Sequence, residues 1–240
     1  MKTGIEWKDR LLDLQGLAAL QYDGENDDIV ELSPSEEIER SKHIALFGKR
    51  FADVTIDNYI AENEKQEEIK NLCRKYVADI EKFYKKGIGI LFVGRTGTGK
   101  SHLAYSILKE AMSKGYRCDV KKFIEIAREI KDSWNNRNTS ESEIIRSYSK
   151  HDFFLIEEIG VQYNTPNEKV ILYDIIEQRY VRQVPTLLTS NLSPQKLQEH
   201  LDFDGEARVW SRIKGSSLIK YFDWEDYRND FLRQKDDRAS

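Results

Sequence analysis

The sequence predicts an α/β fold in which a parallel sheet is flanked by helices, with a small helical appendage at the N-terminus. Short apolar segments alternate with longer segments of helical periodicity between residues 64 and 201, and this alternation is typical of a parallel sheet with helices on both faces. A glycine-rich motif of phosphate-binding type stands between one apolar segment and the next helix. We expect an N-terminal partner-binding segment at residues 1–48 and the main domain at residues 49–240.

Composition limits the class of protein. A chain of 240 residues accommodates one large domain and a smaller one. The net charge of −4 argues against a basic surface that coats nucleic acid, although it is compatible with a local basic groove. The two cysteines and four histidines are too scattered for a zinc site or a disulfide framework. Because neither a signal peptide nor a membrane span is evident, we expect a cytoplasmic protein with no membrane partner.

Two helices are expected in the N-terminal segment. Residues Glu6–Tyr22 carry leucines at amphipathic spacing, and an acidic loop, Asp23–Asp28, follows them. The run Ser33–Glu36 has the pattern of a helix start, and this helix can extend to about Phe47. The two helices either dock on the main domain or offer their leucine face to a partner protein, and the sequence leaves both interpretations open.

The main domain is expected to begin with an extended segment, Phe51–Ile60, and a long helix, Glu64–Lys86. Short apolar runs then mark four strands, which lie at Ile88–Val93, Arg117–Val120, Phe153–Ile156 and Pro185–Ser190. Segments of helical periodicity mark the helices between and after these strands, at residues 101–112, 122–134, 141–150, 170–181 and 194–201.

The motif GRTGTGKS matches the phosphate-binding pattern G-x-x-x-x-G-K-[ST] in full. Its glycines let the backbone curl so that successive N–H groups point at phosphate oxygens. Lys100 supplies a charge for the β- and γ-phosphates, the hydroxyl of Ser101 is a ligand for Mg²⁺, and the next helix adds its positive N-terminal end. The strand before the motif and the helix after it favour a nucleotide site over an incidental turn. The predicted binding residues are Gly94, Arg95, Thr96, Gly97, Thr98, Gly99, Lys100 and Ser101.

Two polar strand ends accompany this loop. Four apolar residues lead directly into Glu157 and Glu158, and in this fold class a strand ending in acids is expected beside the phosphate-binding loop. There the first acid helps to hold Mg²⁺ and the second orients or deprotonates the attacking water. The strand that ends at Ser190 would bring Asn191 toward the γ-phosphate, where an amide can position water. The alternatives are a pair of surface acids and a turn asparagine.

Together with other stretches, these motifs resemble the DnaC family of bacterial helicase loaders, which are AAA+ ATPases. The resemblance covers about Arg50 to Arg228 and implies an AAA+ P-loop NTPase fold that binds ATP. The stretches that carry it are the phosphate-binding loop, the run EIGVQ beginning at Glu158, Thr189–Asn191, the arginine pair Arg208 and Arg212, the region Arg50–Tyr59 and the run Trp224–Arg228.

The resemblance implies roles around the ATP phosphates. Glu158 would be the catalytic acid of Walker B, and Asn191 would be sensor 1. Arg212 looks like the arginine finger that enters a neighbouring subunit's site, with Arg208 one helical turn away. Arg228 looks like sensor 2, which contacts ATP within its own subunit.

One of the implied metal ligands departs from the family pattern. Ser101 and Glu157 would hold Mg²⁺, but the family usually has Asp where this chain has Glu157. The extra methylene moves the carboxylate outward by about one bond length, and Mg²⁺ demands tight octahedral geometry. We therefore expect slow hydrolysis, or a protein that acts mainly as a switch between ATP states.

A second site is implied for single-stranded DNA. In the family, the helix after the second strand carries a lysine and an aromatic residue that contact DNA, and Lys131 and Trp134 occupy that stretch. A tryptophan at a polar helix end can stack on a base while a neighbouring lysine binds phosphate. The alternative is a tryptophan folded onto the core. Thr165 is the matching residue in the segment 163–168, which would line the same groove.

The favoured function is an ATP-dependent loader that places a ring-shaped replicative DNA helicase onto single-stranded DNA during replication initiation. With ATP, its subunits would assemble into a ring or spiral around DNA. One rival is an IstB-type transposition helper ATPase, and another is a non-hydrolysing adaptor that binds helicase and senses ATP. A small-molecule kinase is disfavoured because no acceptor pocket or lid arginine pattern is visible. A phage-encoded loader acting in host cytoplasm is compatible with the sequence, which has no partner motif in the N-terminal segment.

Overall fold

The computed structural model describes residues 20–22, 29–31, 33–134, 140–160, 165–201 and 207–227. The chain divides into two compact units between Thr55 and Ile56. The predicted domain division after residue 48 remains a prediction. Within the described residues, no helix is both long enough and apolar enough to cross a membrane.

The first unit combines helices with a short antiparallel pair of strands. These strands are β1 (Leu20–Tyr22) and β2 (Ile29–Glu31), and they precede α2 (Pro34–Phe47) and α3 (Lys49–Ala52). The prediction of helix was therefore wrong for residues 20–22, because their backbone pairs with β2, and the other residues of that predicted helix lie outside the described ones. Helix α3 likewise occupies the start of a segment that we expected to be extended.

Helix α2 begins and ends as its sequence predicts. The backbone N–H of Ser33 donates to Glu36 Oε2 at 2.9 Å, and the Ser33 hydroxyl accepts from the N–H of Glu36 at 3.5 Å, which completes a capping box. The helix ends at Gly48, whose φ of 76° suits a residue without a side chain.

The second unit is built on a parallel sheet of five strands in the order β4-β5-β6-β3-β7. The four predicted strands are confirmed, and β7 was missed because it is an edge strand whose residues are mostly half-exposed and include a lysine. The strands are β3 (Gly89–Gly94), β4 (Cys118–Lys122), β5 (Phe153–Glu157), β6 (Thr186–Ser190) and β7 (Ser217–Phe222).

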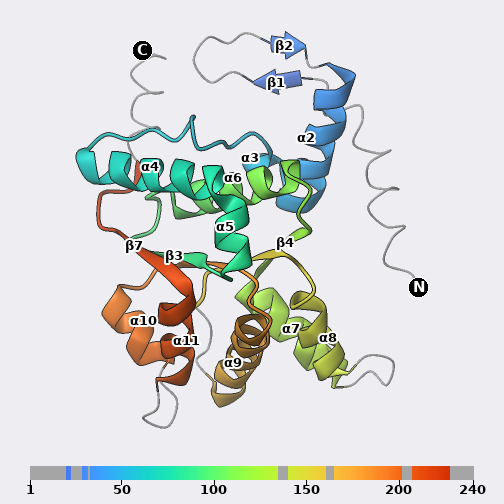
Figure 1. Ribbon diagram of the computed structural model, residues 1–240, viewed down its shortest axis with the longest axis vertical. Coiled ribbons are helices and arrows are strands. Elements are labelled where there is room, and N and C mark those ends of the chain that lie inside the picture. Colours follow the sequence, from blue (N-terminus) through green and yellow to red (C-terminus); the bar gives the residue numbers. More distant parts are fainter. Residues whose placement is uncertain are drawn as a thin grey trace, which may run out of the picture. The chain divides into compact units, whose positions relative to one another are not determined.

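Helices cover both faces of this sheet, as the alternation of strands and helices predicted. Figure 1 shows α4, α5 and α6 on one face and α7 to α11 on the other. The expected long helix Glu64–Lys86 is two helices, because the backbone of Asp79 ends the first and begins the second. The helices are α4 (Glu64–Ala78), α5 (Ile80–Lys85), α6 (Lys100–Ser113), α7 (Phe123–Ser133), α8 (Glu141–Tyr148), α9 (Pro166–Val181), α10 (Pro194–Leu201) and α11 (Arg208–Ser216).

Alternation along the strands assigns their side chains to the two faces. Phe154 and Ile156 on β5 pack in one buried cluster with residues of α7, α8 and α9. Phe153 and Leu155 are equally buried but do not belong to that cluster, since successive side chains point to opposite sides of a sheet. Each such side chain stabilises the fold by about 1.5–3 kcal/mol. Glu157 follows in the same alternation and falls on the α6 side.

A buried arginine forms hydrogen bonds at the N-terminal ends of β5 and β6. Arg179 on α9 is fully buried, and its Nε donates to the Thr186 hydroxyl at 2.9 Å. Its Nη1 donates to the carbonyls of Tyr148 (2.7 Å) and His151 (3.1 Å), and its Nη2 to that of Pro185 (2.5 Å). Burial lowers the pKa of this guanidinium to about 9. One side chain thus joins α9 to the turns that lead into β5 and β6.

We predict that Arg179→Met lowers the free energy of unfolding by about 3–5 kcal/mol, as expected when one partner of a buried polar network is removed. Urea unfolding followed by circular dichroism measures this change. Arg182→Met is the matched control, since Arg182 is exposed and its Nη1 donates to the Ser149 hydroxyl at 3.0 Å. The control should lose about 0.5 kcal/mol or less, and equal unfolding midpoints for the two variants would contradict the assigned role of Arg179.

Candidate nucleotide-binding site

The phosphate-binding loop lies between β3 and α6, in the order that the sequence predicted. β3 ends at Gly94 and α6 begins at Lys100, so the positive N-terminal end of α6 faces the loop. Gly97 and Gly99 have φ angles of 75° and 91°. A Cβ at Gly99 would lie 2.4 Å from the ring of Tyr59. Both the backbone conformation and the available space therefore require glycine there.

Lys100 is buried and folded back on the loop. Its Nζ donates to the Gly94 carbonyl at 2.9 Å and to the Arg95 carbonyl, and it lies 3.5 Å from the Thr98 hydroxyl. These neutral acceptors hold the ammonium beside the backbone that would cradle a phosphate. A phosphate oxygen would give the same ammonium a charged acceptor, and Coulomb attraction would then add to a hydrogen bond that is already charge-assisted.

Glu157 meets the first turn of α6, as expected for an acid of the metal site. The Ser101 hydroxyl donates to Glu157 Oε1 at 2.6 Å, and the Tyr105 hydroxyl donates to Glu157 Oε2 at 2.8 Å. The Glu157 carboxylate is buried at the end of β5. Ser101 and Glu157 thus present adjacent hydroxyl and carboxylate oxygens, which are the ligands that Mg²⁺ prefers.

These oxygens fit a magnesium site completed by nucleotide phosphates. Among the residues that the structure describes, no group of three or more His, Cys, Asp or Glu is placed to hold a metal ion. Magnesium is commonly held by one or two carboxylates together with substrate phosphates and water. Ser101 and Glu157 would therefore hold a Mg²⁺ ion that arrives with the nucleotide.

Glu158 is turned away from the axis of β5 by an unusual backbone conformation. Its φ of 59° is rare for a residue other than glycine, and its N–H donates to the Thr189 hydroxyl at 3.1 Å. The Glu158 carboxylate lies 3.5 Å from the Nζ of Lys122, and both side chains are more than 40% exposed. Because exposed pairs contribute about 0–1 kcal/mol, this carboxylate is free to exchange its partner.

The acids of β5 lie beside the phosphate-binding loop, as expected, although β5 does not pair with the strand that carries the loop. Strand β6 is inserted between β3 and β5. Glu157 nevertheless reaches the loop, since α6 packs over both β5 and β6. β6 pairs directly with β3, with Ser190 opposite Val93. Asn191 therefore follows a strand adjacent to that of the loop, at the edge where Glu157 and Glu158 also lie.

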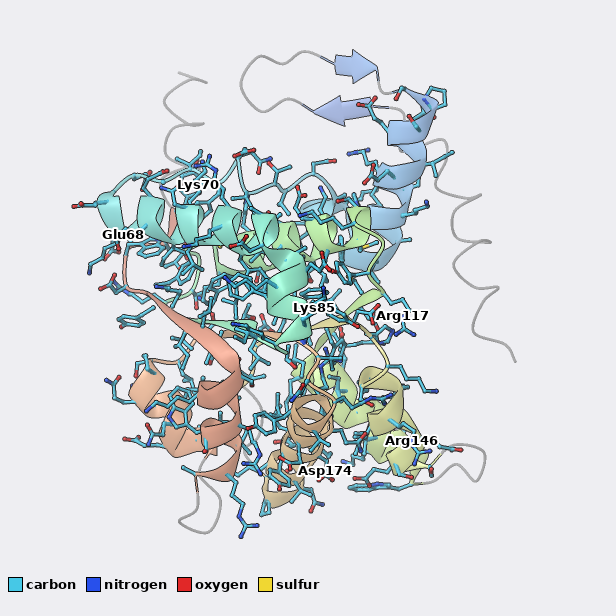
Figure 2. The ribbon with its side chains drawn as sticks, in the orientation of Figure 1. Glu68, Lys70, Lys85, Arg117, Arg146 and Asp174 are labelled. Atoms are coloured by element: carbon cyan, nitrogen blue, oxygen red, sulfur yellow. The ribbon has the colours of Figure 1, made fainter. Side chains whose placement is uncertain are left out.

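Residues from the two ends of the second unit close over the loop. The Thr98 carbonyl accepts hydrogen bonds from the Trp224 indole at 3.0 Å and from the Tyr59 hydroxyl at 3.4 Å. Lys70 on α4, labelled in Figure 2, donates to the carbonyls of Asp57 and Tyr59 at 2.9 Å and 2.7 Å. The loop is thus held from both sides by segments that the sequence had marked only through their family resemblance.

Arg212, the predicted arginine finger, contacts residues of its own chain. Its Nε donates to Glu177 Oε2 at 2.5 Å, and its guanidinium lies 5.0 Å from the centre of the Tyr180 ring. The hydrogen bond to Glu177 raises the pKa of Arg212 above its already high usual value. Arg208 lies one turn earlier on α11, as the spacing predicted, and is exposed. Arg228 lies outside the described residues.

The residues predicted to contact DNA lie at helix ends, two of them at the C-terminal end of α7 and one at the N-terminal end of α9. Trp134 caps the C-terminus of α7, is 52% exposed, and donates from its indole to Glu141 at 2.8 Å. It therefore does not belong to the core, and Lys131 in the preceding turn is exposed as well. Thr165 caps the N-terminus of α9, where its hydroxyl accepts from the N–H of Glu168. Their role in DNA binding remains a prediction.

Two residues of the site were not predicted from the sequence. Tyr105 contacts Glu157, and Lys122 contacts Glu158. The spacing of Tyr105 from Ser101 could have revealed the first, because side chains at i and i+4 lie on one face of a helix. No sequence signal marks Lys122, since its approach to Glu158 depends on the pairing of β4 with β5.

Comparison with known proteins identifies a matching family and several similar proteins. A model of the family described as IstB-like ATP binding protein matches residues 17–209. The replicative helicase loader DnaC of Escherichia coli strain K12 is 34% identical over 176 residues, which cover 73% of this chain and 69% of that protein. The same name belongs to a Buchnera aphidicola protein that is 31% identical over 180 residues, covering 74% and 70% of the two chains.

A solved structure supports the same fold. The crystal structure of the DnaC helicase loader superimposes with a TM-score of 0.64 at 22% identity, covering 72% of this chain and 99% of that one. At this identity the likeness bears on fold, and it confirms the predicted AAA+ architecture.

Proposed function

Because the chain belongs to the family of IstB-like ATP-binding proteins and is one-third identical to a replicative helicase loader, we propose that it is an ATP-dependent helicase loader. It would place a ring-shaped replicative DNA helicase onto single-stranded DNA in the cytoplasm. The observation that carries this proposal is the similarity to DnaC along 73% of the chain, together with the assembled phosphate site. The partner, the hydrolysis of ATP and the self-assembly are parts of the proposal.

In the proposed chemistry, different residues bind the phosphates, hold the metal ion and activate the attacking water. Lys100 and the loop N–H groups bind the β- and γ-phosphates, while Ser101 and Glu157 hold the Mg²⁺ that neutralises phosphate charge. Glu158 leaves Lys122 to accept a proton from the attacking water, and Asn191 orients that water.

Two rival functions can be distinguished from the proposed one by experiment. An IstB-type transposition helper would bind duplex DNA and a transposase, and the description of the matching family model includes the name IstB. The identity to DnaC favours helicase loading over this rival. A non-hydrolysing adaptor would bind helicase and ATP without turnover. Glu157 is the reason to consider this second rival, because its extra methylene is expected to slow hydrolysis.

The first prediction from this proposal concerns the helicase itself. The full chain should be retained by immobilised replicative helicase of the organism from which it comes, and ATP should change the amount retained. Lys100→Ala is the control, since it removes a charged contact to the phosphates and should abolish the effect of ATP. Retention on duplex DNA and transposase, with none on helicase, would instead identify the transposition helper. Absence of ATP turnover alongside helicase binding would identify the adaptor.

The second prediction concerns single-stranded DNA. We expect Trp134→Ala to weaken binding of a single-stranded oligonucleotide by about 1–3 kcal/mol, the usual value of one stacked base. Lys131→Ala should weaken it as well and reduce its salt dependence. Fluorescence anisotropy at several salt concentrations measures both effects. Because Trp134 is exposed, thermal stability should change little, and unchanged DNA affinity in Trp134→Ala would remove this residue from the DNA site.

The third prediction tests whether the active site is shared between subunits. Arg212→Ala retains its own loop and Glu158, whereas Glu158→Gln retains the finger but not the general base. Each variant alone should be nearly inactive, because a finger supplied in trans can be worth several orders of magnitude in rate. Mixing them creates one intact site wherever the second variant neighbours the first, so turnover should partly recover.

ATP hydrolysis is measured across mixing ratios, with single-stranded DNA present and with the parent chain as reference. If the parent turns over and every mixture stays as inactive as its components, Arg212 does not act on a neighbouring subunit.

A further inference from the structure

Tyr105 has a contact that neither the motifs nor the proposed function explains. Its hydroxyl donates to Glu157 Oε2 at 2.8 Å, while Ser101 donates to the other oxygen, Oε1, at 2.6 Å. Tyr105 is 6% exposed and Glu157 is 4% exposed, so little water is available to replace either hydrogen bond. Each oxygen of the carboxylate is thus fixed by a different hydroxyl.

The fold dictates this arrangement. Ser101 and Tyr105 stand four residues apart on α6 and so share one face of the helix. Glu157 shares the α6 side of β5 with Phe153 and Leu155, because side chains alternate along a strand. The helix that carries the metal-binding hydroxyl therefore also carries the hydroxyl that holds the second carboxylate oxygen.

We propose that Tyr105 is a positioning residue that holds the Glu157 carboxylate in the orientation needed for the Mg²⁺ bound with ATP. This inference rests on the nucleotide site of the proposed function. A glutamate has one more rotatable bond than the aspartate usual in the family, so its carboxylate needs more restraint to reach the tight geometry of Mg²⁺. The phenol is attached to a rigid ring packed in the core, and it supplies that restraint.

The direction of the hydrogen bond between Tyr105 and Glu157 is consistent with this role, because the phenol hydroxyl is the donor of the pair. Since a carboxylate only accepts, the hydrogen bond has a single direction and fixes the carboxylate rotamer.

The test removes only the hydroxyl. Tyr105→Phe keeps the ring in the core, and Tyr148→Phe is the matched control. Tyr148 is also buried (3% exposed), and its hydroxyl donates to a different carboxylate, Glu129 Oε2, at 2.5 Å. Binding of Mn²⁺ to the full chain with a non-hydrolysable ATP analogue is measured by electron paramagnetic resonance. Nucleotide affinity is measured separately in EDTA, and melting temperature by circular dichroism.

We expect Tyr105→Phe to weaken Mn²⁺ binding by about tenfold, since partners of a metal ligand are commonly worth 10–100-fold in affinity. Its nucleotide affinity in EDTA should equal that of the parent, because Lys100 and the loop N–H groups are untouched. Tyr148→Phe should bind Mn²⁺ like the parent. If both variants lose melting temperature but neither loses Mn²⁺ affinity, Tyr105 is a packing residue and the inference is overturned.

The outcomes also separate this inference from the proposed function. A parent chain that binds no nucleotide would refute the nucleotide site itself. A parent that binds nucleotide and Mn²⁺, with a Tyr105→Phe variant that titrates identically, would refute only the role of Tyr105.

Glu157→Asp gives a second test, and its single-variant measurement does not depend on how well Tyr105→Phe folds. The shorter side chain restores the family's usual residue but cannot reach both hydroxyls in the present arrangement. We therefore expect several-fold weaker Mn²⁺ binding in Glu157→Asp, and little further loss when Tyr105→Phe is added to it. A gain of Mn²⁺ affinity in Glu157→Asp would overturn the inference, because Glu157 would then be no better positioned than aspartate.

Discussion

The contact between Ser101 and Glu157 unites the site, because it joins the loop that would bind phosphate to the strand that would bind metal. Those two elements are not neighbours in the sheet, since β6 separates β3 from β5. Helix α6 bridges them by starting at the loop and packing over β6 and β5. The parallel arrangement is therefore essential, as it brings the carboxyl ends of three strands to the edge where the helix begins.

The sequence was sufficient for the parts of the fold that depend on local patterns. The capping residues of α2, the apolar runs of four strands and the complete phosphate motif each carry their information within a few residues. The split of the long helix at Asp79 and the edge strand β7 were missed, because neither breaks a local pattern strongly. A half-exposed edge strand with a lysine resembles a loop or a helix end until its pairing with β3 is known.

The same contrast between local patterns and distant contacts applies to the residues of the site. Lys100, Ser101, Glu157 and Glu158 could be found because each stands at a fixed spacing within a motif. The partners of the acids, Tyr105 and Lys122, were missed, since they come from other elements and meet the acids through strand pairing and helix packing. Of the two, Tyr105 carried a signal in its spacing of four residues from Ser101, whereas Lys122 carried none. Glu157 was marked as a departure from the family pattern, but the sequence could not show that a buried hydroxyl faces its extra length.

Three of the charged groups expected to act on ATP are held by partners in the same chain. Lys100 is bonded to carbonyls of its loop, Glu158 to Lys122 and Arg212 to Glu177. The last two pairs are partly exposed, so exchanging their partners costs about 1 kcal/mol or less. Lys100 is buried, and its exchange requires an acceptor that enters the loop. Binding of a triphosphate is therefore the step with a strong electrostatic consequence. The other two exchanges can follow it, with Arg212 moving only where a neighbouring subunit offers a better acceptor than Glu177.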